Sequence, residues 1–202
     1  MKRITALAIS TLLALSIPTA YADECDIPDV YGYDYDCLSE GIAMVEKNGK
    51  WGFIDKTGKV VVPLIYDFAY VFSEGLAWVE KNGKYGFVDK TGKVVVPLIY
   101  DGTWYHFSEG LVMVSKNGKW GFIDKTGKVV IPLIYDGAKR FRDGLAEVKK
   151  NGKWGFVDKT GKVVVPLIYD SAGSFNDGEA EVSVDDELFY IDKEGRFLRY
   201  VY

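Results

Sequence analysis

The sequence predicts an all-β protein in which tandem three-stranded β-meander repeats form an open, curved array. Three observations lead to this fold class. A block of about 34 residues recurs along most of the chain, its β-branched runs favour strands, and Gly-containing turns separate those runs. Gly accounts for 22 of the 202 residues without the three-residue period of collagen. A small closed ring, similar to a propeller, is the alternative, but three strands per unit are few for a propeller blade.

The first 22 residues have the three parts of a secretory signal peptide. Two basic residues precede an uncharged apolar run over residues 4–17, and the motif Ala20-Tyr21-Ala22 places small residues where a signal peptidase requires them. The apolar run is too short to span a bilayer comfortably. We therefore expect cleavage between Ala22 and Asp23 and export of the mature chain, either to the periplasm or as a secreted protein.

Removal of this leader leaves 23 basic and 29 acidic residues, a net charge of −6. An acidic exported protein is a poor candidate for binding nucleic acid or an anionic membrane surface. Cys25 and Cys37 are the only cysteines, and an oxidising compartment makes a disulfide between them the expectation. That disulfide would staple an N-terminal cap over residues 23–37 and contribute roughly 3 kcal/mol to stability.

The rest of the chain is one unit repeated four times and followed by a degraded fifth copy. An aromatic-Gly pair marks the register at Trp51, Tyr85, Trp120 and Trp154, with spacings of 34, 35 and 34 residues. Helical repeats are excluded because Gly and Pro in a helix interior cost roughly 1 and 3 kcal/mol each. The predicted divisions are 38–71, 72–106, 107–140 and 141–174 for the full repeats and 175–202 for a degenerate C-terminal cap.

Each unit divides into three short strands, as the second copy illustrates. The first strand covers residues 76–80, Asn82-Gly83 forms a hairpin turn, and the second strand covers residues 84–89. An Asp-Lys-Thr-Gly turn then leads to a third strand over residues 94–100. Because Pro97 cannot donate a ladder hydrogen bond, this third strand should lie at an edge or contain a bulge.

Alternation along the strands predicts which side chains are buried. Small apolar residues recur on one side of the first strand, as Ala77 and Val79 do, and are assigned to the core. The varying position between them is expected to face outward: Met44, Trp78, Met113, Glu147 and Glu181. In the second strand, the inward-facing residues are expected to be Ile54, Val88, Ile123, Val157 and Ile191.

The block Lys-Trp-Gly-Phe-Ile-Asp-Lys-Thr-Gly-Lys at residues 50–59, followed by Val60 and Val-Val-Pro-Leu-Ile-Tyr-Asp, resembles the bacterial WG repeat, also called KWG. Near-identical blocks stand at residues 119–128 and 153–162, and Tyr85 replaces the Trp in the second copy. The resemblance covers about residues 38–202. It implies β-rich repeats in bacterial proteins that are often exported, and it supplies no catalytic residues.

The sequence contains few residues that point to catalysis or metal binding. Asp recurs in every unit, as Asp55 and Asp67 do, and a row of carboxylates could bind calcium, but their positions in turns and beside Lys favour turn formation. His106 is the only histidine, and no nucleophile motif surrounds it, so we expect a surface or half-buried side chain rather than a general base. No catalytic residue, metal site or cofactor is predicted.

The positions that differ between repeats suggest a recognition surface. The linkers at residues 68–71, 102–106, 137–140 and 171–174 vary, and the first two are rich in aromatics. A scaffold that keeps its core and varies one set of positions is typical of binding proteins, although drift at unconstrained sites produces the same pattern. The candidate contact residues are Met44, Tyr70, Trp78, Trp104, Tyr105 and Met113.

The sequence therefore predicts an exported, non-enzymatic interaction module that recognises a protein or a cell-envelope glycan. A glycan hydrolase needs two carboxylates in unlike environments, which near-identical repeats do not offer. A purely structural spacer would have uniform polar linkers, whereas these linkers carry aromatics. The repeated Trp or Tyr is expected to pack between units, with the adjacent Gly leaving room for it, and a ligand platform is the alternative.

Overall fold

The computed structural model describes residues 34–35, 39–103 and 106–201. Their regular structure is entirely β, in five antiparallel four-stranded sheets. Sheet 1 contains β1 (Asp34–Tyr35), β2 (Ile42–Lys47), β3 (Lys50–Asp55) and β4 (Val60–Tyr66). Sheet 2 contains β5 (Phe68–Ala69), β6 (Leu76–Lys81), β7 (Lys84–Asp89) and β8 (Val94–Tyr100). Sheet 3 contains β9 (Gly102–Thr103), β10 (Leu111–Lys116), β11 (Lys119–Asp124) and β12 (Val129–Tyr135). Sheet 4 contains β13 (Gly137–Ala138), β14 (Leu145–Lys150), β15 (Lys153–Asp158) and β16 (Val163–Tyr169). Sheet 5 contains β17 (Ser171–Ala172), β18 (Glu179–Val184), β19 (Glu187–Asp192) and β20 (Phe197–Tyr200).

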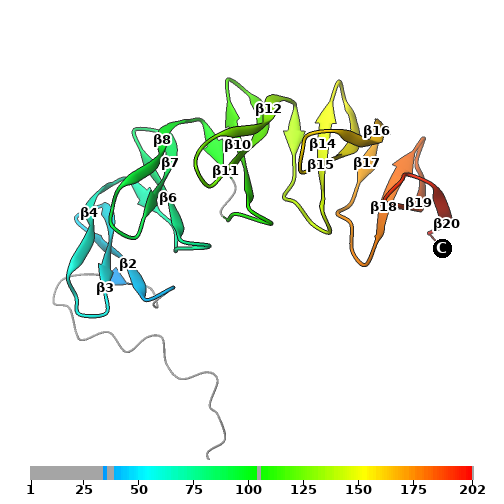
Figure 1. The fold of residues 1–202 in the computed structure, drawn as a ribbon. Coiled ribbons are helices and arrows are strands. Elements are labelled where there is room, and N and C mark those ends of the chain that lie inside the picture. The colour runs from blue at the N-terminus through cyan, green and yellow to red at the C-terminus, as the bar shows by residue number, and fades with distance from the viewer. Residues whose placement is uncertain (1–33, 36–38, 104–105, 202) are drawn as a thin grey trace, which may run out of the picture.

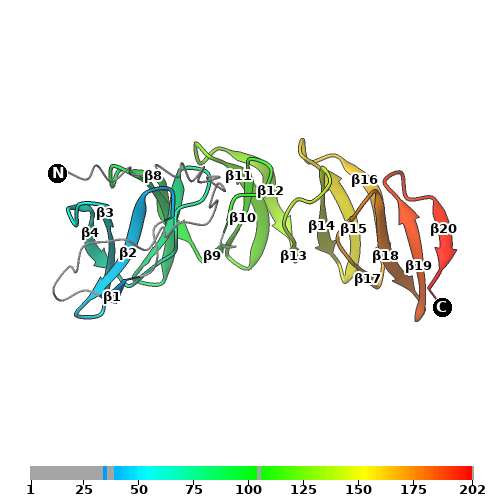
Figure 2. The same cartoon turned by 90° about the horizontal axis from the view of Figure 1, so that it is seen from below.

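The five sheets follow one another along an open arc, with sheet 1 and sheet 5 at opposite ends (Figure 1). The predicted open array of antiparallel meanders is confirmed, and the two end sheets do not meet to close a ring (Figure 2). No helix in the described part of the chain is long and apolar enough to cross a membrane.

Each sheet has one strand more than the sequence predicted. The linker residues form a two-residue strand that pairs with the next long strand, for example Ala69 with Val79. The flanking residues extend this pairing, since the Asp67 N–H donates to the Glu80 carbonyl at 2.8 Å and the Tyr70 N–H to the Trp78 carbonyl at 3.1 Å. A two-residue strand is too short to leave a periodic pattern in the sequence, which is why the prediction missed it.

Both faces of the first long strand are buried, contrary to the predicted alternation. The inward set Ala77, Val79 and Val88 packs on the preceding sheet, as expected. The other face of the same sheet packs on the following one, through Trp78, Phe87 and Val96. Met44, Trp78, Met113 and Glu147 are therefore buried rather than outward-facing. Only Glu181, in the last sheet, is exposed, because no sheet follows it.

A pair of phenylalanines contributes to the core at each interface between sheets. The linker residue Phe72 meets Phe53 of the preceding sheet edge to face, with ring centroids 4.8 Å apart. The same contact recurs between Phe107 and Phe87 at 5.2 Å. Each linker thus covers the core of the sheet before it, which orders the stack without a shared central core.

Polar contacts repeat at every junction as well. Lys125 of sheet 3 pairs with Glu74, two residues before the first long strand of sheet 2, at 2.6 Å. Lys159 pairs with Glu109 at 2.7 Å one unit later. The Glu109 carboxylate also accepts a hydrogen bond from the Gly144 N–H at 3.1 Å. Each contact joins successive repeats at the same place in the unit.

Proline in the fourth strand of sheets 1 to 4 accompanies a large bulge, in agreement with the predicted edge or bulge position. In sheet 1, β4 advances four residues between the pairs Phe53–Val62 and Trp51–Tyr66, while β3 advances two. Pro63 lies in the bulged segment, where its missing N–H does not interrupt the ladder. The strands β4, β8, β12 and β16, each with such a proline, are called the proline edge below.

The last sheet ends the array with a polar face. Glu181, Tyr190 and Arg199 occupy the places that Met113, Phe122 and Ile131 hold in sheet 3, on the face directed away from the rest of the array. Arg199 pairs with Glu179 at 2.6 Å and stacks on the Tyr190 ring at 4.3 Å. This polar face is typical of a terminal capping repeat.

Candidate binding surface on the linker edge

The short strands β5, β9, β13 and β17, with the residues that follow each up to the next long strand, form one long side of the array, called the linker edge here. It lies opposite the proline edge in Figure 2, because the two sets of strands occupy opposite ends of each sheet order. The linker edge contains most of the residues that vary between repeats. Surface that differs from one repeat to the next is therefore concentrated on this edge.

An aromatic cluster lies on the linker edge where sheets 1, 2 and 3 meet. The Trp78 ring stacks with Phe68 at 5.4 Å and 20° and with Tyr70 at 5.9 Å and 8°. Trp51 of sheet 1 meets Phe68 at 5.2 Å, and His106 of the next linker meets Tyr70 edge to face at 5.2 Å. The cluster thus joins residues from three successive sheets.

Exposure divides this cluster into a base and a rim. Trp78 is 5% exposed and forms the base, whereas Phe68 is 39% exposed. Tyr70 is half-buried and His106 is exposed, as predicted for the histidine. The rings that face solvent are therefore the linker residues, which are held in place by the buried Trp78. Flat, partly exposed rings on a rigid base are a suitable surface for a ligand with an apolar face.

Of the six predicted contact residues, only Tyr70 is found partly exposed. Met44, Trp78 and Met113 lie within the cores between sheets at 5–6% exposure, so the expectation that they face outward is wrong. Trp104 and Tyr105 lie outside the described residues, as do Cys25, Cys37 and the leader. Phe68 and His106 belonged to the predicted linkers and were not named as contact residues. The place of Phe68 in the same linker as Tyr70 was a usable signal, whereas the contact of His106 with Tyr70 is visible only in the structure.

The linker residue and the strand residue that lies beside it change together between sheet 2 and sheet 4. The stacked pair Tyr70 and Trp78 in sheet 2 corresponds to Lys139 and Glu147 in sheet 4, since both linker N–H groups donate to the carbonyl of the strand residue. The Lys139 ammonium lies 3.7 Å from the Glu147 carboxylate. An aromatic stack in one repeat is thus replaced by an ion pair in another, which independent drift does not explain.

The repeated aromatic at the Trp-Gly position is mainly a packing residue. Trp51, Tyr85, Trp120 and Trp154 are half-buried, and each packs against the core between its sheet and the next. Packing between units was the favoured expectation and is confirmed. The Gly beside each one has a different role from the one predicted, because the backbone of the fourth strand fills the space next to it.

The repeated aspartates close turns. Asp124 Oδ1 accepts hydrogen bonds from the Thr126 N–H at 2.9 Å, the Thr126 hydroxyl at 2.6 Å and the Lys128 N–H at 3.1 Å. The Thr126 hydroxyl is the main reason that the pKa of Asp124 lies below its usual value, with the backbone N–H groups adding to it. These contacts agree with the turn interpretation of the Asp residues.

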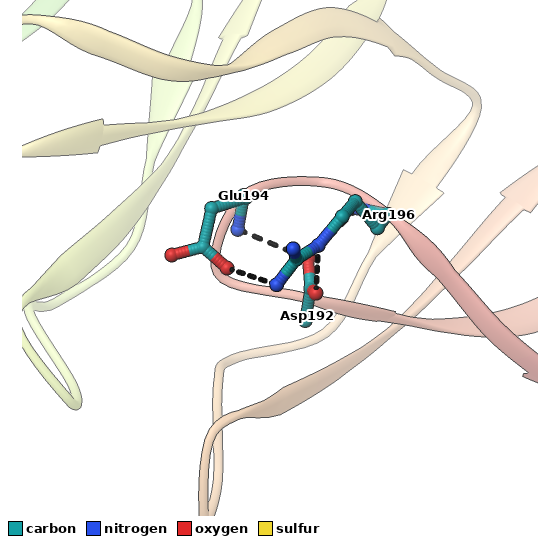
Figure 3. A network of polar contacts seen from close by, with 3 residues as sticks. All are labelled: Asp192, Glu194 and Arg196. Carbon is teal, nitrogen blue, oxygen red and sulfur yellow. Dashed lines mark hydrogen bonds and ion pairs between the residues drawn. The ribbon is translucent and has the colours of Figure 1, made fainter.

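The degenerate copy preserves this turn with different side chains. Glu194 stands at the Thr position and Arg196 at the Lys position, and Figure 3 shows both around Asp192. Arg196 Nε donates to Asp192 at 2.6 Å, and its Nη2 donates to Glu194 at 3.0 Å. No group of three His, Cys, Asp or Glu side chains in the described part of the chain is arranged to hold a metal ion.

The proline edge carries a second exposed surface that the sequence analysis missed. Each full repeat exposes one Val and one Ile there, between 40% and 53%: Val60, Ile65, Val94, Ile99, Val129, Ile134, Val163 and Ile168. The sequence analysis assigned the β-branched run to the third strand without dividing its residues between core and solvent. The recurrence of an apolar residue at these two positions in every copy was the available signal.

The repeat pattern matches the model of one known family, described as the WG containing repeat, over residues 34–51, 51–85, 85–120, 120–154 and 154–187. This match spans most of the chain, so the protein belongs to the WG-repeat family. The curated proteins include no sequence that matches it.

Parts of several solved structures resemble the array. A structure of the eukaryotic initiation factor aligns with a TM-score of 0.54 at 12% identity, over 87% of this chain and 56% of that one. Kluyveromyces lactis Hsv2 gives 0.48 at 10% over 83% and 61%, and the WD40 beta propeller domain of Doa1 gives 0.40 at 14% over 84% and 70%. The array spans less than two thirds of the length of the first two proteins, and the likeness concerns fold alone.

Proposed function

We propose that this protein is an exported, non-enzymatic binding module that recognises a cell-envelope glycan or a protein. The observation that carries the proposal is the aromatic cluster on the linker edge, where Phe68, Tyr70 and His106 face solvent above the buried Trp78. Its solvent-facing members come from the linkers, which vary between repeats.

The chemistry of the cluster favours a glycan. The C–H face of a sugar ring buries apolar area against an aromatic face, and the ring quadrupole favours such contacts. The stack of Phe68 and Tyr70 on Trp78 fixes the rings before a ligand arrives, which reduces the entropy lost on binding. Export is part of the proposal because residues 1–22 have the sequence of a signal peptide and the expected cleavage follows Ala22.

A protein partner is the second candidate, and a different surface favours it. The exposed Val and Ile residues of the proline edge form an aliphatic row repeated along four sheets. Apolar surface of this kind is typical of protein interfaces rather than of sugar sites. Binding of a glycan should therefore need the linker edge, and binding of a protein should need the proline edge.

The test is retention of the purified protein on insoluble envelope glycan and on envelope proteins, compared among three variants. We expect Phe68→Ala with Tyr70→Ala to lose glycan retention at least tenfold. Phe197→Ala, which removes a 53% exposed aromatic from the last sheet, is the matched control and should not change it. Ile99→Ser with Ile134→Ser tests the proline edge. Retention of glycan that survives loss of the aromatic cluster would contradict the glycan assignment, and no retention of either class would contradict the proposal as a whole.

A further inference from the structure

Sheet 4 differs from the other sheets by one buried carboxylate. Glu147 is 1% exposed, at the position of Trp78 and Met113. Its Oε1 accepts no hydrogen bond from any residue that the structure describes, and the Lys139 ammonium lies 3.7 Å away. Burial of a charge costs free energy that an ion pair only partly offsets. Since sheets 2 and 3 form the same interface with apolar residues, the pair is not a requirement of the fold.

The ammonium that Glu147 attracts lies in the wall of a cavity. Lys139 lines a cavity of about 280 Å³ together with Met113, Ala138, Arg140 and Ser174. Its Nζ also donates to the Ala172 carbonyl at 2.7 Å and lies 5.3 Å from the centre of the Trp154 ring. Three surrounding groups, the Glu147 carboxylate, the Ala172 carbonyl and the Trp154 ring, thus hold the charged end of a normally flexible side chain at one place, which favours binding of an anion there.

Arg140 supplies a second positive charge to the same cavity. It is exposed, and its guanidinium makes no ion pair or hydrogen bond with a residue in the described ranges. A guanidinium beside an ammonium suits a carboxylate, which can accept several charge-assisted hydrogen bonds from the two. Met113 and Ala138 give the cavity an apolar wall. The cavity therefore combines two cations with an apolar wall.

We propose that this cavity is a subsite for the carboxylate of a uronic acid, so that the glycan bound at the linker edge is an acidic one. Lys139 and Arg140 bind the carboxylate, and Glu147 is a positioning residue that holds the Lys139 ammonium without touching the ligand. The inference rests on the proposed function, because the aromatic stack of Phe68, Tyr70 and Trp78 that packs on the sugar rings lies on the same edge, two sheets earlier in the array.

The experiment measures binding of tetragalacturonic acid and of the uncharged tetragalactose to the purified protein by titration calorimetry at low salt. We expect the acidic oligomer to bind at least tenfold more tightly than the neutral one. Arg140→Gln should remove that preference and leave neutral binding unchanged. Arg142→Gln removes the same charge two residues away, outside the cavity lining, and should change neither affinity.

A double replacement tests the role of Glu147. Lys139→Met with Glu147→Met restores apolar residues like those of the other sheets, so the protein should remain folded by circular dichroism and lose the acidic preference. Glu147→Gln should keep the lysine but weaken binding of the acidic oligomer, with a steeper dependence on salt because the ammonium is less fixed.

Three results would overturn the subsite. The first is equal affinity for the two oligomers, and the second is an acidic preference that survives Arg140→Gln. The third is a tetraglutamate peptide that binds as tightly as the uronate. If the neutral oligomer binds and that binding is lost in the Phe68→Ala, Tyr70→Ala variant, the proposed function stands while the subsite fails. If neither oligomer binds, the subsite fails, and the envelope retention experiment decides the proposed function separately.

Discussion

A Cβ atom added to Gly121 would lie 2.5 Å from the carbonyl oxygen of Ile131, on the neighbouring strand. The same contact recurs between Gly52 and the Val62 carbonyl at 2.6 Å. Gly121 has no positive φ, so its need for glycine comes from the close approach of the bulged fourth strand rather than from backbone conformation. Two contacts thus explain the Trp-Gly pair of the repeat. The aromatic ring packs against the core between two sheets, and the bulged fourth strand leaves no room for a Cβ atom at the glycine.

Gly121→Ala should destabilise the protein by about 1–3 kcal/mol, the usual cost of forcing extra volume into a packed site. Gly137→Ala is the matched control, since its added Cβ would meet Lys149 and Trp154 at ordinary distances of 3.5 Å. Urea unfolding followed by circular dichroism measures both. An equal midpoint for the two variants would mean that the fourth strand moves aside without cost.

The last repeat shows why the sequence alone could not explain the need for a glycine beside the aromatic residue. Phe189 stands at the Gly position there, and the sequence analysis took the change as degradation. In sheet 5 the fourth strand is the short β20, which has no proline and only a one-residue irregularity opposite Tyr190 and Ile191. The glycine and the proline bulge are therefore lost together, and only the register between strands reveals that they depend on one another.

Trp78→Ala should destabilise the protein by about 3–5 kcal/mol, as expected when a large buried side chain is removed. Phe68→Ala should cost far less, because its ring is 39% exposed. Thermal unfolding of the two variants beside the parent chain measures the difference. A Trp78→Ala protein as stable as the parent would restore the idea that this side chain is a surface contact.

The alternation of side chains predicted one face of the strands correctly and the other incorrectly. Val88 and Ile123 are buried as expected, while Met113 on the opposite face is buried against the expectation. A period of two separates core from solvent only when a sheet has one covered face. Here sheets 2, 3 and 4 each lie between two others, and the stacking that covers the second face is not encoded in any single repeat.

Stability should fall as the pH drops below about 4, the ordinary range of carboxyl groups. Hydrogen bonds from the Lys119 ammonium and the Asn151 N–H hold the pKa of Asp136 below its usual value. Burial alone would raise the pKa of Glu109, but Lys159 and the Gly144 N–H outweigh it and lower the pKa. Carboxyls with lowered folded-state pKa values bind fewer protons than in the unfolded chain, so their contribution is complete above the ordinary pKa and is lost as the pH falls.

Urea unfolding between pH 7 and pH 3 measures this dependence, and a midpoint that stays constant would contradict it. A local check uses Thr126→Val, which removes the hydroxyl that donates to Asp124 at 2.6 Å. The pKa of Asp124 should then rise toward its ordinary value in a carbon-13 titration. Thr103→Val is the matched control, because its hydroxyl donates to the Met113 carbonyl rather than to a carboxylate.

Glu181→Met with Arg199→Ile should make the protein associate. These changes give the outer face of sheet 5 the residues that sheet 3 carries at the matching positions, Met113 and Ile131, beside the existing Tyr190. They also remove the ion pair between Arg199 and Glu179. The new face is an apolar patch without a following repeat, and such patches bind other copies of the chain.

Light scattering coupled to size exclusion, over a range of protein concentrations, measures this association. We expect the apparent mass of the variant to rise with concentration above that of the parent chain. Glu187→Met is the control for added hydrophobicity, because Glu187 is an exposed residue of β19 at the hairpin turn. If the variant and the control have the parent's mass at every concentration, the polar residues of sheet 5 do not act as the stop that ends the array.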